Sequence, residues 1–392
     1  MVDAVNSPGR PGRADNAARL RILIVNWRDI RNPAAGGAEL HLQEVARRLV
    51  RDGFPCIQYA HAFAGAPAAE VVDGVEVHRT GNPFLFNFTA LFGIRRWVRR
   101  HRIDVVIDDS NKIPFLLPWA SPAPVVARFH HLFGRAIFRE TNPLAALYVW
   151  LFEALIPWAY RNVPVITVSP STEEELKAKG LGRRAPMTLA VNGVDLTRYR
   201  PHADVPRDKH LIVHIGRLMR YKNVQTLLRA FALLRQDVPR ARLVIGGDGN
   251  HRPALEALAR ELNIADAVDF RGFVSEDEKL RLYNEAAVFV NPSLKEGWGL
   301  TSIEANACGT PVVAADSPGL RDSVVDHRTG LLVPALDPAA LARAIRSVLE
   351  DDALAARLRA GALAWAAEHD WERTYEDTRD ALLAAAAARR PA

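Results

Sequence analysis

Short runs of aliphatic and β-branched residues alternate along the chain with longer stretches in which apolar positions recur every three or four residues. Residues 21–25 form the first such run, and residues 38–52 have the helical period. This alternation is typical of parallel β-sheets whose strands are connected by covering helices. Further strands of the same series are predicted at residues 56–60, 75–79, 104–108, 125–129 and 165–168.

A second strand–helix series begins at residues 210–215, after a strong turn signal at Asn192 and Gly193. We therefore expect two Rossmann-like α/β domains with parallel sheets, and ligands in such sheets bind beyond the carboxyl ends of the strands. The later strands of the second series are predicted at residues 242–246, 268–271, 288–290, 311–314 and 331–333. The predicted parts are a flexible extension at 1–19, a first domain at 20–190 joined by a C-terminal helix at about 375–392, and a second domain at 191–374.

Length and composition agree with two globular domains, because 392 residues exceed what one ordinary core holds. No run of 18 or more apolar residues predicts a membrane-spanning helix. The polar start of the chain lacks the apolar stretch of a signal peptide, so the expected compartment is the cytosol. Cys56 and Cys308 have neither metal-site nor redox-site spacing and are expected to be reduced and buried.

Charge is unevenly distributed between the two halves. Residues 1–190 contain 24 Lys and Arg against 17 Asp and Glu, whereas residues 191–392 contain 27 against 28. A basic first half favours an anionic partner such as a phospholipid surface, a lipid phosphate or a nucleic acid. Because the chain has neither an aromatic-basic RNA-binding signature nor zinc-finger spacing, nucleic acid is not the expected partner.

The segment 291–313 carries the strongest candidate chemistry. A predicted strand runs into a loop with Gly297 and Gly299, and a helix is predicted from about residue 300 to residue 307. Glycines let backbone N–H groups approach an anion, and a helix N-terminus offers free donors at the positive end of its dipole. The loop therefore predicts a phosphate site. Glu296 and Glu304 bracket it, and carboxylates accept hydrogen bonds from the paired hydroxyls of sugars.

A second element follows the first strand of the second series. Gly216 ends the strand, and Arg217 and Lys222 lie where a loop becomes a helix. Fixed cations at this position neutralise a leaving diphosphate without a metal. Asp108 and Asp109 do not form the Asp-x-Asp pattern of metal-dependent transferases, so no metal is expected.

These two elements resemble the donor-site motifs of glycosyltransferase family 4, in which two Glu bracket seven residues and a Gly-Arg…Lys-Asn pattern follows a strand. The resemblance implies the GT-B fold and retaining transfer from a nucleoside-diphosphate sugar, without a metal or other cofactor. It implies that Glu296 contacts sugar hydroxyls and Glu304 the ribose hydroxyls. Arg217 and Lys222 would contact the diphosphate. The sugar and phosphate would also be lined by Gly297, Trp298, Gly299, Leu300 and Thr301, with Trp298 where Phe is more usual.

Weaker motifs of both domains also resemble the family. Turns after two predicted strands would line the nucleotide, the second through backbone groups, so the base is not readable. UDP is the first expectation for the donor and GDP the second. In the first domain, a loop with two glycines would reach the donor phosphate or the acceptor. The nucleotide turns contain Gly247, Gly272, Phe273 and Val274, and the first-domain loop contains Gly36 and Gly37.

Two adjacent histidines end the predicted strand at residues 125–129. Alignment with the family places His130 at the position of a functional His that approaches the donor sugar, while His131 lies where Asp is common. A lone His is more often structural than catalytic. For two histidines at the carboxyl end of a strand, facing the expected cleft, a functional role is as much expected as a structural one. We assign the functional role to His130 first, with His131 as the alternative.

Residues 84–102 combine aromatic side chains with five arginines. A basic, aromatic amphipathic helix can lie on an anionic bilayer. The other interpretation is an ordinary covering helix with solvated arginines. We expect peripheral contact with the inner face of the cell membrane and a lipid-linked, cell-envelope glycan or small-molecule acceptor.

Three other functions fit this architecture. A sugar-nucleotide epimerase of the same fold would lack the pattern of Glu296, Gly297, Gly299 and Glu304. A phosphorylase would need a Lys for pyridoxal phosphate in a much longer chain. A non-catalytic binding protein with a decayed site would not be expected to keep Arg217.

Overall fold

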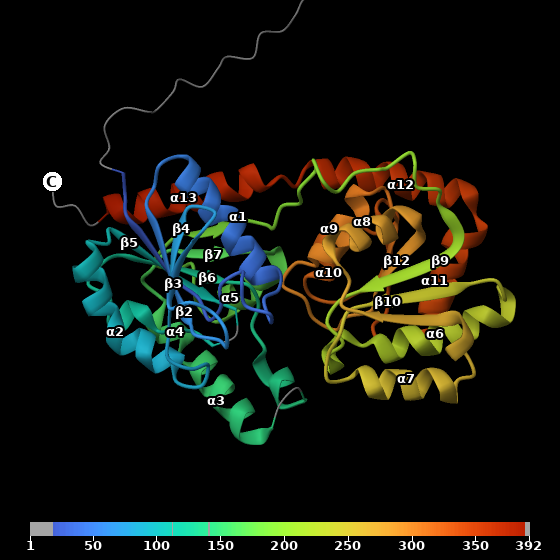
Figure 1. Cartoon of the computed structure of the whole chain (residues 1–392), viewed down its shortest axis with the longest axis horizontal. Coiled ribbons are helices and arrows are strands. Elements are labelled where there is room, and N and C mark those ends of the chain that lie inside the picture. The colour runs from blue at the N-terminus through green and yellow to red at the C-terminus, as the bar shows by residue number, and fades with distance from the viewer. Residues whose placement is uncertain (1–18, 112, 140–141, 389–392) are drawn as a thin grey trace, which may run out of the picture.

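The computed structural model describes residues 19–111, 113–139 and 142–388. The predicted extension at 1–19 therefore lies outside the described residues except for Arg19, as do the last four residues of the predicted C-terminal helix. The described chain forms two lobes, each built on one β-sheet (Figure 1).

The first sheet has eight strands in the order β3-β4-β2-β1-β5-β6-β7-β8, and all of its pairs are parallel except β3 with β4. The strands predicted for the first domain are confirmed, with small changes at their ends. Sequence reasoning did not predict β3, which pairs with β4 as a short edge hairpin, or β8. The bounds are β1 Ile22–Val25, β2 Cys56–His61, β3 Ala69–Val72, β4 Val75–Thr80, β5 Val105–Ser110, β6 Val125–Phe129, β7 Val165–Thr167 and β8 Met187–Leu189.

The second sheet has six parallel strands in the order β11-β10-β9-β12-β13-β14. All six were predicted. The central strands read as apolar runs because helices cover both faces of a parallel sheet, whereas the edge strand β11 alternates apolar and charged residues. The bounds are β9 Asp208–Ile215, β10 Arg242–Gly246, β11 Val268–Gly272, β12 Ala286–Asn291, β13 Val312–Ala315 and β14 Gly330–Val333.

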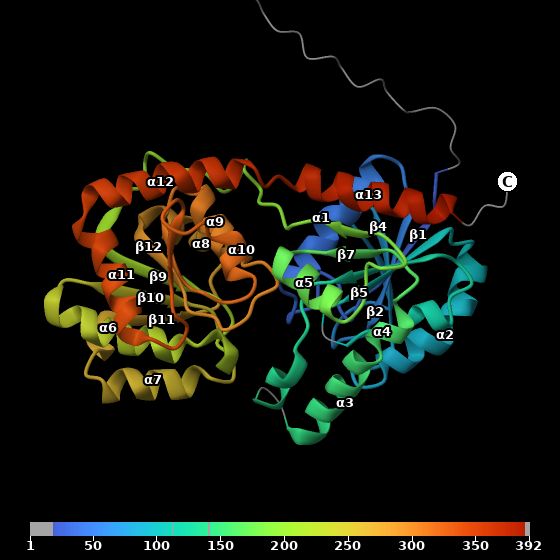
Figure 2. The same ribbon diagram turned by 180° about the vertical axis from the view of Figure 1, so that it is seen from behind.

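Helices cover both faces of the first sheet. Helices α1 and α13 pack on one face, and α2, α4 and α5 pack on the other. Helix α3 extends away from the sheet at the lower edge of the lobe in Figures 1 and 2. The bounds are α1 Gly37–Arg51, α2 Phe86–His101, η1 Leu117–Trp119, η2 Gly134–Arg139, α3 Pro143–Ala154, α4 Ile156–Ala159, α5 Pro170–Ala178 and α13 Trp371–Ala387.

The second sheet is covered by α6, α7 and α11 on one face and by α8, α9 and α10 on the other. Helix α12 packs beside α9 and contributes Leu358 and Ala366 to the two cores. The bounds are η3 Arg220–Lys222, α6 Val224–Asp237, α7 Arg252–Glu261, η4 Ala265–Ala267, α8 Glu276–Glu285, α9 Leu300–Ala307, α10 Leu320–Ser323, α11 Pro338–Glu350 and α12 Asp352–Ala367.

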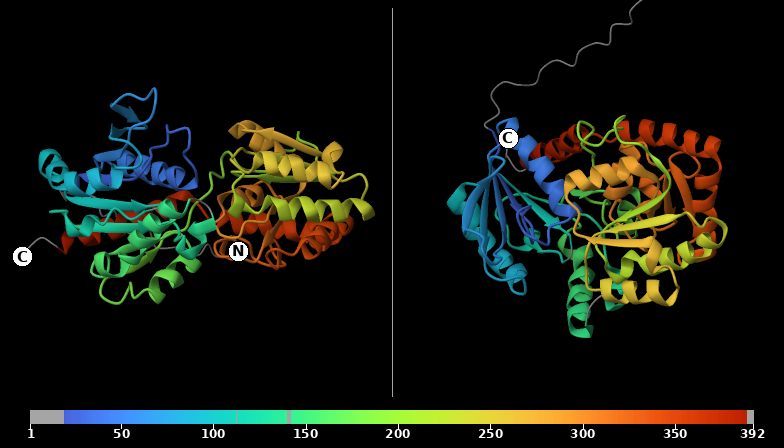
Figure 3. Two further views of the ribbon diagram at one scale, coloured as in Figure 1. Left: turned by 90° about the horizontal axis from the view of Figure 1, so that it is seen from below. Right: turned by 45° about the vertical axis from the view of Figure 1, so that its right-hand side comes forward.

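The chain crosses between the lobes twice, and the two crossings lie side by side. Helices α12 and α13 form a band along both lobes, which is visible from two sides and from below (Figures 1, 2 and 3). The Val194 N–H donates to the His369 carbonyl at 2.9 Å, and Val194 forms a parallel bridge with Asp370. Gly193 fits here because a Cβ on it would lie 2.4 Å from the Trp371 nitrogen.

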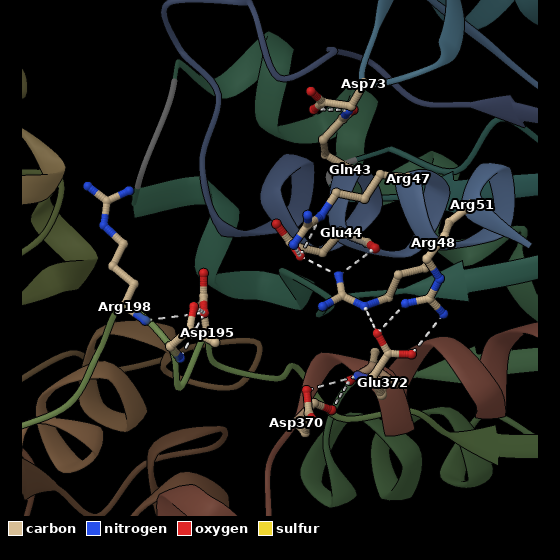
Figure 4. A network of polar contacts seen from close by, with 12 residues as sticks. Gln43, Glu44, Arg47, Arg48, Arg51, Asp73, Asp195, Arg198, Asp370 and Glu372 are labelled. Carbon is tan, nitrogen blue, oxygen red and sulfur yellow. Dashed lines mark hydrogen bonds and ion pairs between the residues drawn. The ribbon is translucent and has the colours of Figure 1, made fainter.

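Ion pairs fasten the start of α13 to α1 of the first lobe (Figure 4). Glu372 accepts from Arg48 Nε at 2.9 Å and from Arg51 through two nitrogens at 2.6 and 3.0 Å. The Tyr375 hydroxyl donates to Asp52 one turn later. With Tyr375 and Leu382 buried in the core of the first sheet, α13 packs as part of the first lobe although it follows the second in sequence.

Candidate active site

In both sheets, predicted site residues follow the strands between which the strand order reverses. In the second sheet this point lies between β9 and β12, and in the first it lies between β1 and β5. Loops that leave adjacent strands in opposite directions open a crevice at such a point, which is where open α/β sheets bind ligands. The predicted site segments follow these strands: Gly216 follows β9, Glu296 follows β12, and Gly36 follows β1.

The donor loop, residues 296–301, leads into helix α9 as predicted. Gly299 is the residue before the helix and has φ +96°, a left-handed conformation that favours glycine. Its Cα approaches Ser323 so closely that a Cβ would lie 2.8 Å from the serine hydroxyl. The loop therefore delivers the first-turn N–H groups of Leu300 and Thr301 with no side chain of residue 299 in front of them.

Glu296 and Lys222 are brought together by this loop. The Lys222 ammonium donates to Glu296 Oε1, and each side chain is 14% exposed. Arg217 lies at the end of β9, exposed, and donates to the Tyr221 hydroxyl at 3.3 Å. The two cations proposed for the diphosphate thus lie at the same edge of the sheet as the carboxylate proposed for the sugar.

Glu304 is buried on α9, and its two oxygens have different partners from α8. Lys279 Nζ donates to Oε1 at 3.2 Å, and the Tyr283 hydroxyl donates to Oε2 at 3.0 Å. Burial raises the pKa of Glu304 above its ordinary value, although Lys279 opposes the change. Each carboxylate oxygen has two lone pairs, so the contacts with α8 leave acceptor capacity for hydroxyl groups.

The predicted nucleotide turns meet at the carboxyl ends of β9, β10 and β11. Gly247 has φ +125° and lies so close to Gly216 that a Cβ would be 1.9 Å from the Gly216 oxygen. Its N–H donates to the Gly272 carbonyl at 2.6 Å. Phe273 is 87% exposed, whereas Val274 is buried against Gly246. These glycines remove side chains from the surface where a nucleotide would lie.

Trp298 departs from the expectation that it lines the sugar. Its side chain is 3% exposed and packs against His369, with ring centroids 5.3 Å apart. His369 in turn lies 4.3 Å from the Trp365 ring centroid. The indole therefore packs between the donor loop and the crossing between the lobes. It has almost no exposed surface for contact with a sugar.

The first lobe meets the donor loop at two glycines. A Cβ on Gly297 would lie 2.8 Å from the His130 carbonyl oxygen, and a Cβ on Gly37 would lie 2.7 Å from a methyl group of Leu300. The Gly36 N–H donates to Glu39 Oε2 at 2.8 Å, which holds the two-glycine loop at the start of α1. The structure thus brings together Gly37, His130 and the donor loop, as the sequence predicted.

The two histidines after β6 have different surroundings. His130 is buried, and its Nε2 lies 3.1 Å from Asp109 Oδ1. His131 is partly exposed. Its pKa is lowered to about 3 by burial and by the positive charges of Lys295, His130, Lys222 and Arg217.

Sequence reasoning missed several residues of this site. Lys279 and Tyr283 hold Glu304, and their spacing of four on one helix was an available signal. Asp109 was considered only as a metal ligand. Asn111 donates to Glu39 Oε1 at 2.7 Å, and that contact joins positions 72 residues apart, which no local pattern shows.

Two features are absent from the described residues. No helix among them is long and apolar enough to cross a bilayer. Within the same ranges, no group of three or more His, Cys, Asp or Glu side chains is arranged to hold a metal ion.

Comparison with known proteins covers both lobes. Residues 35–198 match the family described as Glycosyltransferase Family 4, and residues 196–365 match Glycosyl transferases group 1. The D-inositol 3-phosphate glycosyltransferase of Streptomyces avermitilis is 30% identical, over 98% of this chain and 92% of that protein. The glycogen synthase of Mycobacterium tuberculosis is 28% identical, over 93% of this chain and 95% of its own.

Solved structures agree with the fold. Sucrose-phosphate synthase from Thermosynechococcus elongatus has a TM-score of 0.81 at 24% identity, covering 94% of this chain and 100% of that one. Anabaena Alr3699/HepE in complex with UDP-glucose has a TM-score of 0.74 at 20% identity, covering 93% and 100%. The epimerase and binding-protein alternatives are set aside by these matches. The chain belongs to glycosyltransferase family 4 and is a GT-B enzyme that transfers sugar from a nucleotide-sugar donor.

Proposed function

We propose that this enzyme is a retaining, metal-independent transferase that moves a sugar from a nucleoside diphosphate to an acceptor hydroxyl between its two domains. The single observation that carries the proposal is the close packing of Gly297 against the His130 carbonyl. This contact places the donor loop of the second domain beside the end of β6 in the first. Residues 20–190 with α13 would hold the acceptor, and residues 191–374 would hold the donor.

In this proposal the leaving diphosphate is stabilised without a metal. Arg217, Lys222 and the first-turn N–H groups of α9 would face the oxygens on which negative charge develops. Such preorganised donors stabilise a developing anion more than they stabilise the bound substrate. Glu304 would hold the ribose, with Gly247 and the turn at 272–274 along the nucleotide, and Glu296 would hold the sugar hydroxyls.

Retention would follow from attack on the same face from which the diphosphate leaves. Glu296, the carboxylate within the donor loop, is paired with Lys222 and is assigned to sugar hydroxyls, so we assign no side chain of the described residues as nucleophile for a double displacement. The leaving phosphate oxygen would accept the proton of the acceptor hydroxyl as the new C–O bond forms and the old one breaks. His130 would position the donor sugar.

For the nucleotide we propose UDP first and GDP second. The support is that Anabaena Alr3699/HepE, a structural neighbour, is described in complexes with UDP and with UDP-glucose. A direct test offers an α-linked UDP-sugar in buffer with EDTA and follows the product by proton NMR. An α-linked product supports the proposal. Inversion, or activity that needs a divalent cation, contradicts it.

We further propose that the acceptor is lipid-linked or part of a cell-envelope glycan, reached from the inner face of the membrane. Helices α2 and α3 lie together, since Phe88 packs against Tyr148 and Phe152. Around this contact large apolar side chains are exposed: Phe92 is 79% exposed and Leu144 is 82% exposed. Other exposed large apolar side chains from the same part of the chain complete what we propose to be an apolar face, and they include Phe84, Leu85, Trp119, Leu147, Trp150, Leu151 and Trp158.

Charge beside the apolar face suits anionic lipid. The exposed arginines of the segment 84–102 are Arg95, Arg96, Arg99, Arg100 and Arg102. Each basic residue near an anionic bilayer contributes about 1 kcal/mol of attraction. Exposed apolar side chains that gather in one region can mark an interaction site, whereas single exposed ones are ordinary. Acceptors of the curated relatives include a small molecule and a glycan by name, so both remain alternatives.

Vesicle flotation tests the membrane proposal. At low salt the enzyme should float with vesicles containing anionic lipid, and the double variant Phe92→Asp, Trp158→Asp should not. Leu336→Asp is the matched control, because Leu336 is exposed on the second domain, away from this face. Failure of the unaltered enzyme to float at low salt would overturn the proposal.

A further inference from the structure

A buried carboxylate contacts the ring of His130. Asp109 is the fifth residue of β5 and is fully buried. Its Oδ1 lies 3.1 Å from His130 Nε2, and its Oδ2 accepts from the side-chain amide of Asn26, at the end of β1. Burial alone would raise the pKa of Asp109, but its interactions with His130, Arg128 and Asn26 hold it below its ordinary value.

A buried arginine completes this group. Arg128 pairs with Asp109 across β5 and β6, with 3.7 Å between NH1 and Oδ1, and both side chains are 0% exposed. Arg128 NH2 also donates to the Thr378 hydroxyl on α13 at 3.4 Å. No further hydrogen bond reaches its Nε or NH1 from the described residues. A buried ion pair costs desolvation energy and is weak evidence for stability, which favours a functional reason for keeping it.

The contact fixes which nitrogen of His130 bears hydrogen. An ionised carboxylate only accepts hydrogen bonds, so Nε2 must donate to Asp109. In the neutral ring, Nδ1 is then the nitrogen with the free lone pair. The ring is held from another side by His41, whose centroid is 5.4 Å away and edge-on.

We propose that Asp109 and Arg128 are positioning residues for transfer: Asp109 fixes the tautomer and orientation of His130, and Arg128 holds Asp109 in place. This inference rests on the proposed role of His130. A Cβ on Gly297 would lie 2.8 Å from the His130 carbonyl oxygen, so the donor loop packs directly against the residue whose ring Asp109 orients. Since Arg128 reaches Thr378, the group also connects α13 to the site.

The chain offers a matched control for Asp109. Asp108 precedes it on β5 and is equally buried, but its side chain points to the other face of the sheet. There its Oδ2 accepts from the Tyr160 hydroxyl at 2.6 Å and from the Leu117 N–H at 3.1 Å. Both aspartates can be replaced by asparagine with the same change in shape, although burial raises the pKa of Asp108 and interactions with His130 and Arg128 lower that of Asp109.

The test compares Asp109→Asn, Asp108→Asn and His130→Ala in the full chain. In Asp109→Asn, an amide NH₂ must face a second donor, either on Asn26 or on His130 Nε2. We expect kcat to fall on the order of 10²-fold, as for a misplaced reacting group, while Kd for UDP measured calorimetrically changes less than twofold. Nitrogen-15 NMR should show His130 leaving the Nε2–H tautomer. Asp108→Asn should keep both kcat and the tautomer.

Each other outcome is decisive. Equal loss of kcat in the two asparagine variants, or an unchanged tautomer in Asp109→Asn, would mean a merely structural role and overturn the inference. If His130→Ala lowers kcat and Asp109→Asn does not, the inference fails while the proposed function stands. If His130→Ala leaves kcat unchanged, both fail. Should Asp109→Asn not fold, Arg128→Gln replaces it with the same expected loss of kcat and unchanged Kd.

Discussion

The rings of Trp298 and His369 pack against each other at the crossing between the lobes, with centroids 5.3 Å apart and tilted by 36°. The tryptophan belongs to the donor loop, and the histidine precedes α13. The loop that would receive the sugar is thus in direct contact with the segment about which the two lobes would move. Trp298 Nε1 is buried and has no hydrogen-bond partner among the described residues.

Substitutions at Trp298 test whether its indole stabilises the donor loop or contacts the sugar. Trp298→Ala should lower the free energy of unfolding by about 3–5 kcal/mol, because it leaves a cavity. Trp298→Phe should change it by less than about 1 kcal/mol, since the lost apolar contact is offset by removal of an unpaired donor worth roughly 1–3 kcal/mol. Urea unfolding and donor KM measure this. A large rise in KM for Trp298→Phe with unchanged stability would contradict the placement.

Arg217 should matter for catalysis and little for folding. Its exposed side chain lies at the end of β9, so Arg217→Ala should change the free energy of unfolding by no more than about 0.5 kcal/mol. Loss of one charge-stabilising donor should lower kcat roughly 10²- to 10³-fold. Arg220→Ala, an exposed arginine of the same loop, is the control and should keep kcat. Equal effects of the two variants would refute the diphosphate role.

Removal of divalent cations should leave activity intact. The cations proposed for the diphosphate are Arg217 and Lys222, and fixed protein charges are not removed by a chelator. Initial rates with and without EDTA should agree within error. If magnesium or manganese restores a rate lost on chelation, the proposal that protein groups alone stabilise the leaving diphosphate is wrong.

Asp108 should make stability depend on pH. Burial raises its pKa from 3.8 to about 7, with partial opposition from the Tyr160 hydroxyl. Between about pH 4 and pH 7 the folded chain therefore keeps a proton that the unfolded chain loses, so this contribution to stability falls as pH rises through that window. The slope is on the order of 1 kcal/mol per pH unit. Urea unfolding of the wild type and of Asp108→Asn should diverge in this way, and parallel curves would disprove it.

Most of the fold could be predicted from the chain because its strands are buried on both faces. Strands β10, β12, β13 and β14 of the second sheet contain apolar runs, and helix α9 begins at Leu300 as the glycine before it indicates. Strand β3 was missed because its exposed edge position carries Ala69 and Glu70 in place of an apolar run.

The local geometry of the segment 296–304, a glycine loop leading into a helix, was likewise predicted, because its residues lie close together in sequence. Glu296, Gly299 and Glu304 belong to one loop and helix. The contacts that join distant segments were not readable: Asp109 with His130, Glu304 with Tyr283, and Trp298 with His369 all depend on how strands and crossings are stacked. Trp298 was misjudged for this reason, since its position in the motif says nothing of the side to which the indole turns.

The central claim is that the second domain binds a nucleoside-diphosphate sugar through Glu304 and the α9 N-terminus. Calorimetric titration of UDP and GDP, with EDTA present, measures this most directly on the wild type and on Glu304→Ala and Glu304→Gln. The account predicts metal-free binding of one nucleotide by the wild type and a loss on the order of 10²-fold in Glu304→Ala, since hydrogen bonds to a charged group contribute about 1.5–3 kcal/mol. Glu304→Gln should lie between the two. Binding of neither nucleotide by the folded wild type, or equal affinity in Glu304→Ala, would contradict the account.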